Sequence, residues 1–179
     1  MNSFVPQPAS GAPAKAPVPR RRRKDARPSE LTAAALALFV DKGFAATRLD
    51  DVAARAGVSK GTLYLYFSSK EALFKAVIED GMVAALAAAE ERLAGFHGSA
   101  ADLLHELLLG WWQQIGRTAM AGVTKLIISE SRNFPEVAQY YHERVITRGR
   151  ALLRHALERG IGSGEFRPLD LDYAVYAVI

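Results

Sequence analysis

The chain of 179 residues is long enough for one or two small domains, and because half of it is hydrophobic, most of it should fold around a sizeable core. The lack of cysteine excludes a disulfide framework and a thiolate metal site. Charges interrupt every apolar stretch before the roughly 18 residues that a transmembrane helix needs, so we expect a cytoplasmic protein.

Positive charge is concentrated near the N-terminus. Residues 1–29 carry seven basic side chains and only one acidic side chain, a net charge of +6, whereas the whole chain carries +4, which leaves the remainder at −2. Residues 1–26 are rich in proline and alanine and are predicted to form a disordered basic tail. A basic tail on a mildly acidic body is typical of nucleic-acid-binding proteins, and a solubilising leader is the alternative.

Helical periodicity begins after the tail and continues to the end, which predicts an all-α fold. The first helix is expected to begin at Ser29 as N-cap and to end at Gly43. A short second helix is expected between Thr47, as its cap, and Gly57. Ser59 is expected to cap a third helix over residues 60–67.

Five further helices are expected. A long fourth helix follows Ser68 or Ser69 and runs toward residue 96. After Ile78 its apolar face consists of alanines and Gly81, and such small residues predict close helix packing there. The fifth follows Ser99 and presents a core face of Leu104, Leu107, Leu108, Trp111 and Ile115. A sixth spans about 123–132, a seventh runs from Pro135 to glycines 160, 162 and 164, and an eighth begins near 169–170.

The last helix presents an apolar face with no stop signal after it. We therefore expect either that the chain is truncated at its C-terminus or that a partner chain covers this face.

Residues 48–67 carry the strongest local pattern, two short helices joined by a tight turn. The exposed side of the second helix is expected to hold small, polar or basic residues, namely Ser59, Lys60, Gly61, Thr62, Tyr64 and Tyr66. Such a helix fits a major groove, and Lys60 and Lys70 suit phosphates. From the residues alone, the alternative is a helical hairpin inside an all-α core, with both tyrosines buried.

From Arg27 to Met82 the sequence closely resembles the DNA-binding domain of the TetR/AcrR family of transcriptional regulators. The matching residues are Ala34–Phe39, Gly43–Phe44, Thr47, Val52–Ala53, Ala56–Tyr64, Tyr66–Phe67, Ser69–Glu71 and Leu73–Phe74. The resemblance implies a helix-turn-helix domain over residues 27–80, with the motif at 48–67. It also implies a helical ligand-binding and dimerisation domain over residues 81–179.

The resemblance also implies roles for individual residues. The implied DNA contacts are Thr47, Arg48, Ser59, Lys60, Gly61, Thr62, Tyr64, Tyr66 and Lys70, and the implied core residues are Leu49, Val52, Leu63 and Phe67. At Leu65 the family often has an aromatic residue, so one contact is expected to be missing. Val77 and Ile78 are expected to anchor the fourth helix, which ligand displaces to spread the two DNA-binding heads.

A ligand pocket is expected among the fourth to seventh helices. Its candidates are Phe96, Trp111, Trp112, Gln113, Met120, Tyr140 and Tyr141, with ordinary core packing as the alternative for each. Adjacent helical residues point about 100° apart, so Trp111 and Trp112 cannot both face one pocket.

The predicted function is that of a sequence-specific DNA-binding regulator, a repressor that a small-molecule effector releases. Its expected partners are double-stranded DNA with two-fold symmetry and a second copy of the chain. The basic tail is expected to reach the neighbouring minor groove or phosphates. No catalytic, metal-binding or cofactor motif is found. Alternatives are a regulator without an effector, and an all-α ligand carrier or enzyme with an incidental helix-turn-helix.

Overall fold

The computed structural model describes residues 27–179, and the predicted basic tail, residues 1–26, lies outside them. Every regular element of the described residues is a helix, as predicted. The head consists of α2 (Arg27–Lys42), α3 (Leu49–Arg55) and α4 (Lys60–Tyr64). The remaining elements are α5 (Lys70–Ile78), η1 (Glu79–Val83), α6 (Ala84–Ala94), α7 (Ala100–Trp111), η2 (Trp112–Gly116), α8 (Met120–Glu130), α9 (Pro135–Tyr141), η3 (His142–Ile146), α10 (Thr147–Gly162) and α11 (Leu171–Val178).

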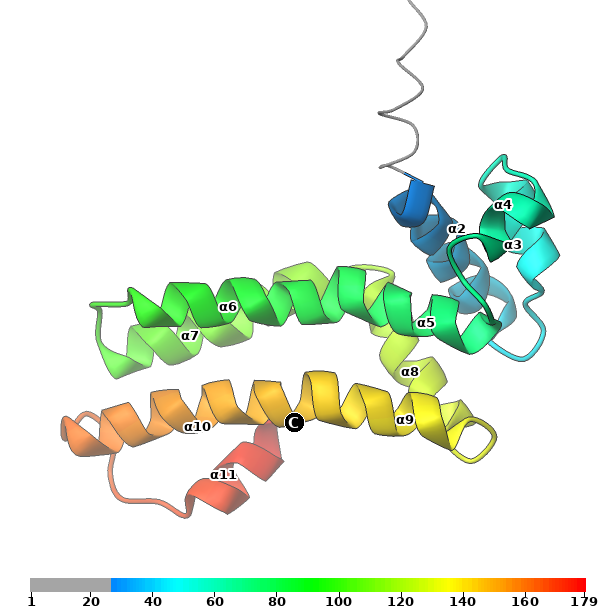
Figure 1. Ribbon diagram of the computed structural model, residues 1–179. Helices are drawn as coiled ribbons and strands as arrows, with labels where there is room; N and C mark the ends of the chain where they lie inside the picture. Colours follow the sequence, from blue (N-terminus) through cyan, green and yellow to red (C-terminus); the bar gives the residue numbers. More distant parts are fainter. Residues whose placement is uncertain (1–26) are drawn as a thin grey trace, which may run out of the picture.

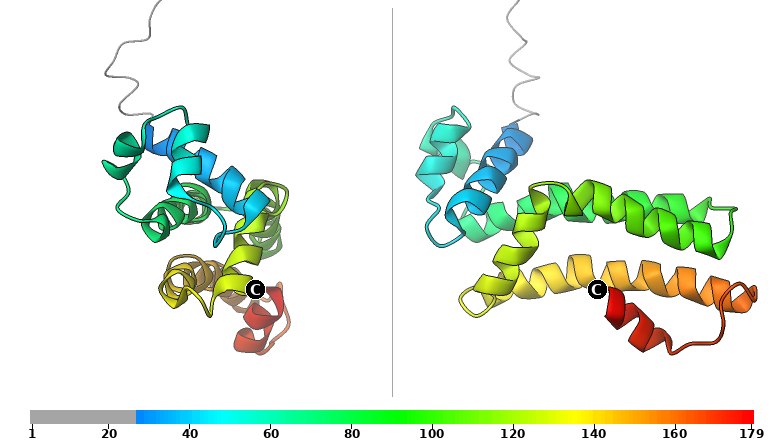
Figure 2. Two further views of the ribbon diagram at one scale, coloured as in Figure 1. Left: turned by 90° about the vertical axis from the view of Figure 1, so that its right-hand side faces the viewer. Right: turned by 180° about the vertical axis from the view of Figure 1, so that it is seen from behind.

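Two long rods dominate the body (Figure 1). One rod is α5–η1–α6 and the other is α9–η3–α10, and in each a five-residue π-helical segment joins two α-helices. The π-helical segments widen the helix locally and shift which residues face the core. Helix α7 packs against α10, α8 crosses steeply between the rods, and α11 lies beside α10 (Figure 2).

Serine N-caps were predicted well because capping depends on residues three apart. Ser59, Ser69 and Ser99 accept hydrogen bonds from the backbone N–H groups of Thr62, Ala72 and Asp102. The cap predicted at Ser29 is wrong, because α2 already includes Arg27 and Ser29 lies inside it.

Glycines turn the chain at two of the predicted places. Gly43, after α2, has a φ of +83°, and Gly57, between α3 and α4, has a φ of +67°, a region in which side chains other than glycine are strained. At the end of α10 the prediction was partly wrong. Gly160 and Gly162 lie within the helix, and only Gly164, with a φ of +77°, turns left-handed.

One hydrophobic core extends from the head into the body. Three phenylalanine rings pack together with centroids 5.0–5.3 Å apart, namely Phe39 of α2, Phe44 just after α2, and Phe74 of α5. The Phe44 ring centroid also lies 4.5 Å from that of Phe134. Because Phe134 directly precedes α9, this aromatic cluster joins the head to the second rod. Val77 and Ile78 are buried within the same core, as predicted.

The predicted core face of α7 is only partly correct. Ile115 is buried, but Leu104, Leu107 and Trp111 are half-buried and Leu108 is exposed, whereas Leu103 is the buried leucine. The π-helical segment η2 interrupts the α-helical periodicity on which that prediction was based. The close packing predicted at Gly81 is confirmed, since a Cβ there would lie 2.5 Å from the Met120 Cε atom.

Candidate DNA-binding surface and ligand pocket

Helix α4 stands at the outer edge of the head (Figure 1). Leu63 is completely buried and fixes the helix on the core, while Lys60 and Gly61 are exposed. The Tyr64 side chain is 47% exposed, which contradicts the alternative of a hairpin buried in the core. Leu65, where the family often has an aromatic residue, is 83% exposed. The exposed side of α4 therefore holds small and polar residues beside one lysine.

Lys60 is held by a carboxylate of the preceding helix. Its Nζ atom lies 3.0 Å from both oxygens of Asp50 on α3, and 6.0 Å from the centroid of the Tyr64 ring. The hydrogen bond to Asp50, followed by the charge of Asp50, raises the pKa of Lys60 above its usual value. A phosphate must therefore compete with Asp50 for this ammonium group.

Lys70 has a structural role that the sequence did not reveal. Its ammonium group donates hydrogen bonds to the carbonyl oxygens of Phe44 (2.7 Å) and Ala45 (3.0 Å) and lies 4.6 Å from the Phe44 ring centroid. These bonds hold the segment between α2 and α3 against the start of α5. In the free protein, Lys70, the predicted phosphate contact, directs its ammonium group at protein carbonyls.

Thr47 does not cap α3 as predicted. Arg48 occupies the cap position without a side-chain hydrogen bond, and the buried Thr47 hydroxyl faces the carbonyl oxygens of Leu38 (3.2 Å) and Gly43 (2.7 Å). Its side chain thus ties the segment before α3 back to α2. The predicted contact of this hydroxyl with a phosphate does not fit its burial, whereas the Arg48 side chain is exposed.

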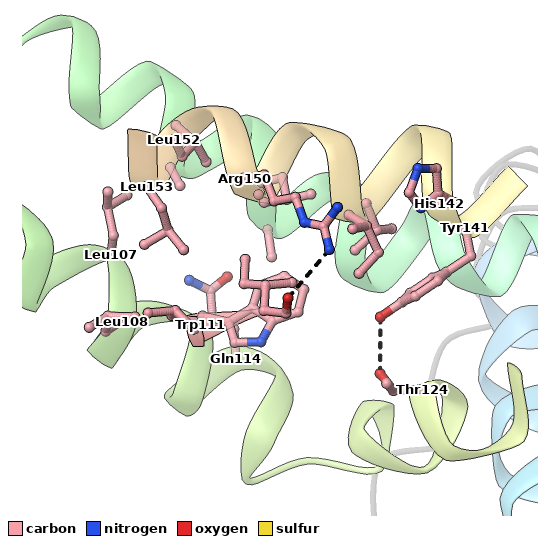
Figure 3. Close-up of a pocket in the computed structure, with 18 of the residues that line it drawn as sticks. Leu107, Leu108, Trp111, Gln114, Thr124, Tyr141, His142, Arg150, Leu152 and Leu153 are labelled. Atoms are coloured by element: carbon pink, nitrogen blue, oxygen red, sulfur yellow. Dashed lines mark hydrogen bonds between the residues drawn. The ribbon is translucent and has the colours of Figure 1, made fainter. Parts of the chain in front are cut away.

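A cavity of about 720 Å³ lies in the body, between α6, α7, α8, the second rod and α11 (Figure 3). Its walls are mostly apolar, including Leu107, Leu108, Leu152 and Leu153. The sparse polar groups that line it are Arg92, Gln114, Thr124, Ser131, Tyr141, His142 and Arg150. Such a cavity has the size and composition of a small-molecule site.

Two of the seven predicted pocket residues line this cavity, Trp111 and Tyr141. The Tyr141 hydroxyl lies 3.4 Å from that of Thr124, and burial raises its pKa more than this contact lowers it. The prediction that Trp111 and Trp112 cannot share one pocket is confirmed, since Trp112 is 57% exposed outside it.

The other predicted pocket residues have different surroundings. Phe96 stacks with the guanidinium of Arg159, and Met120 packs against Gly81. Gln113 is exposed, and the Tyr140 hydroxyl donates to the Glu79 carboxylate. The wall residues that sequence reasoning missed come from helices far apart in the chain, so periodicity within one helix could not identify them.

The π-helical segment η1 contacts both the head and the body through two adjacent side chains. Asp80 accepts a hydrogen bond of 2.6 Å from the buried Thr32 hydroxyl of α2. Glu79 accepts hydrogen bonds from Tyr140 and from Arg144 (3.0 Å) in the second rod. Burial raises the pKa of Glu79, but the hydrogen bonds from Arg144 and Tyr140 outweigh it and hold that pKa below its usual value.

Among residues 27–179, no three histidine, aspartate or glutamate side chains cluster as metal ligands would. None of the helices in that part of the chain combines the length and the apolar character needed to span a bilayer.

Comparison with known proteins gives matches over both parts of the chain. The model of the tetR family of bacterial regulatory proteins matches residues 31–77, and that of a tetracyclin repressor-like C-terminal domain matches residues 97–179. YfiR, an HTH-type transcriptional regulator of Bacillus subtilis, is 32% identical over 152 residues, which cover 84% of this chain and 73% of that protein.

Two further relatives are similar along most of their length. The HTH-type transcriptional repressor KstR2 of Mycolicibacterium smegmatis is 28% identical over 169 residues, covering 82% of this chain and 71% of that protein. The structure of the regulator FadR from Bacillus subtilis with stearoyl-CoA has 26% identity and a TM-score of 0.72, covering 84% of this chain and 80% of that one. The chain therefore belongs to the TetR family and is a DNA-binding transcriptional regulator.

Proposed function

We propose that the protein is a repressor that binds a two-fold symmetric operator as a homodimer and leaves it when a small molecule fills the body cavity. The observation that carries the proposal is that the rod α5–η1–α6 links the head, which contains α4, to the cavity. Helix α4 presents exposed polar groups, the cavity is apolar, and the rod α5–η1–α6 runs from the head to the cavity wall.

The relatives support both parts of this proposal. KstR2 is a repressor, and FadR was crystallised with stearoyl-CoA, a ligand with a long apolar chain. A largely apolar cavity of about 720 Å³ suits a ligand of this kind. Because the relatives are bacterial DNA-binding regulators, we propose that this protein also acts on DNA in the cytoplasm and has no catalytic role.

We propose a division of labour between residues 27–80, which bind DNA, and residues 81–179, which bind the effector and the second copy. The proposed contacts are exposed or half-exposed residues of the head, namely Arg48, Ser59, Lys60, Gly61, Thr62, Tyr64 and Tyr66. Arg48 and Lys60 would bind phosphates, and the polar side of α4 would enter the major groove. Lys70 and Thr47 would act indirectly, by holding the segment that precedes α3.

Selection of bound duplexes from a random pool tests DNA recognition, and Gly61→Glu tests the placement of α4. A Cβ at Gly61 would meet only the Ser59 Oγ atom, at 3.9 Å, so the variant should fold normally. The added carboxylate would face phosphates and fill the groove, and we expect at least about a hundredfold loss of affinity. Ala84→Glu adds the same charge at an exposed position of the body and is the control.

Full affinity of Gly61→Glu for the selected duplex would show that α4 is not the recognition helix. Loss of affinity in Ala84→Glu to the same degree would show a general effect of charge. Repeating the selection with an apolar effector distinguishes the main alternative, a regulator without an effector, in which binding would not change. A carrier or enzyme with an incidental helix-turn-helix would select no sequence even at low salt.

A further inference from the structure

Arg150 places a cationic group in the wall of an otherwise mostly apolar cavity (Figure 3). The side chain projects from α10 into the space between α10 and α7, and its Nε atom is buried without a hydrogen-bond partner. One Nη atom lies 3.4 Å from the main-chain oxygen of Ile179, a long hydrogen bond, and the guanidinium stacks on Tyr176 at 4.1 Å. Arg150 as a whole is half-buried, but a buried donor such as its Nε atom is costly to leave without an acceptor.

The charges around the cavity make it complementary to an anion. Among the described residues that line it, Arg92, His142 and Arg150 can carry positive charge, and aspartate and glutamate are absent. Arg92 is paired with Glu106 at 3.3 Å. By contrast, no aspartate or glutamate side chain of residues 27–179 lies within ion-pair distance of Arg150. Of the two arginines that line the cavity, Arg150 is therefore the one without an acidic side chain as its partner.

We propose that the effector is an amphipathic carboxylic acid, whose carboxylate binds Arg150 and whose hydrocarbon part fills the apolar remainder of the cavity. This inference rests on the proposed function, in which the cavity holds the effector. A planar carboxylate matches the guanidinium fork, and a small rotation of the Arg150 side chain would bring the buried Nε donor to it together with an Nη donor. Leu107, Leu152 and Leu153 provide apolar surface near Arg150 for the chain of the acid.

The test compares decanoic acid with methyl decanoate, which has the same chain and no charge, with the acid below its micelle concentration and the ester below its solubility limit. The chain has two tryptophans, of which Trp111 lines the cavity, so binding is followed by Trp111 fluorescence in a Trp112→Phe background. We expect the acid to bind at least about tenfold more tightly than the ester, because charge-assisted hydrogen bonds are the stronger ones. Equal affinities would overturn the proposal.

Two arginines of α10 provide a matched pair of variants. Arg150→Met should abolish the preference for the acid and leave binding of the ester in place. Arg154→Met removes the arginine one turn further along, which pairs with Asp172 of α11 outside the cavity, and should keep the preference. A preference that survives in Arg150→Met, or that falls equally in both variants, would overturn the assignment. If Arg150→Met does not fold, Arg150→Lys replaces it in the test. Lysine retains the charge without the guanidinium fork, so this variant should show an intermediate preference for the acid.

Release of the selected duplex is measured on the same samples, which separates this inference from the proposed function. Release by the ester as readily as by the acid would leave the proposed function standing and overturn the role of Arg150. If neither compound binds although the protein still selects DNA, the acid class is excluded and regulation by an apolar effector loses its support.

Discussion

Lys60 is proposed to contact a phosphate, yet in the free protein it is paired with Asp50. Both side chains are largely exposed, so the pair contributes little to stability, but Asp50 opposes DNA in two ways. It occupies the ammonium group, and it places a negative charge beside the phosphates. The ion pair thus weakens the sequence-independent part of binding more than the part that depends on base edges.

We therefore expect Asp50→Asn to bind non-specific duplexes about threefold or more tightly at low salt, with a salt dependence steeper by about one released counterion. Fluorescence anisotropy across a salt series measures both quantities. Asp51→Asn is the control, because the neighbouring Asp51 pairs with Lys42, 3.6 Å away, and not with Lys60. Equal gains in both variants would show that only net charge matters, and no gain in Asp50→Asn would place Lys60 away from DNA.

At the scale of the helices, η1 is the element that contacts both functional parts. Asp80 binds Thr32 of the head, and Glu79 binds Tyr140 and Arg144 of the second rod, which lines the cavity further along. A ligand that moves the second rod would thereby move η1, and α2 would follow through the Thr32 hydroxyl. The buried packing of Met120 on Gly81 keeps η1 from moving independently of α8.

Thr32→Val removes the hydroxyl and keeps the shape of this buried side chain. We expect the separate affinities for DNA and for ligand to change little. The factor by which ligand weakens DNA binding should fall about fivefold, because the variant loses a hydrogen bond to a charged group. Thr32→Ser retains the hydroxyl and should retain the coupling. Unchanged coupling in Thr32→Val would assign it instead to the aromatic contact between Phe44 and Phe134.

The elements also show what a sequence can and cannot predict. The caps at Ser59, Ser69 and Ser99 and the turns at Gly43 and Gly57 depend on residues a few positions apart, and they were predicted correctly. The bonds of Lys70 join residues 25 and 26 positions apart, and no local pattern signals them. The cavity wall gathers residues from six α-helices and two π-helical segments, so its membership depends on packing angles that the periodicity of one helix does not contain.

The π-helical segments explain a further error. On an ideal α-helix Leu103 and Ile115 would point about 120° apart, so they could not share one face. The wider turn of η2 reduces this angle, and both side chains are buried. The sequence predicted a helix over these residues but not the wider π-helical turn at η2. The residues predicted to form the buried face of α7 therefore differ in part from those that are buried.

For the whole molecule, the proposed dimer must form through a surface that the monomer leaves open. Helix α11 buries Val175 against α10 but leaves Tyr173 75% exposed, and aromatic residues of this kind are enriched in interfaces. Tyr173→Asp should convert a dimer to a monomer, because the charge would be desolvated in the interface. The third position of a helix tolerates aspartate well, so the fold should be unaffected.

A two-fold operator makes the consequence measurable. Two heads that belong to one dimer bind half-sites about 34–36 Å apart with a high effective concentration, which a monomer lacks. Tyr173→Asp should therefore lose about a hundredfold in affinity for the full operator and almost none for an isolated half-site. DNA titrations measure both affinities, and light scattering gives the mass of the variant in solution. Ile128→Asp, at a position of α8 that is 72% exposed, should remain dimeric. A dimeric Tyr173→Asp protein with full operator affinity would mean that the two copies meet away from α11.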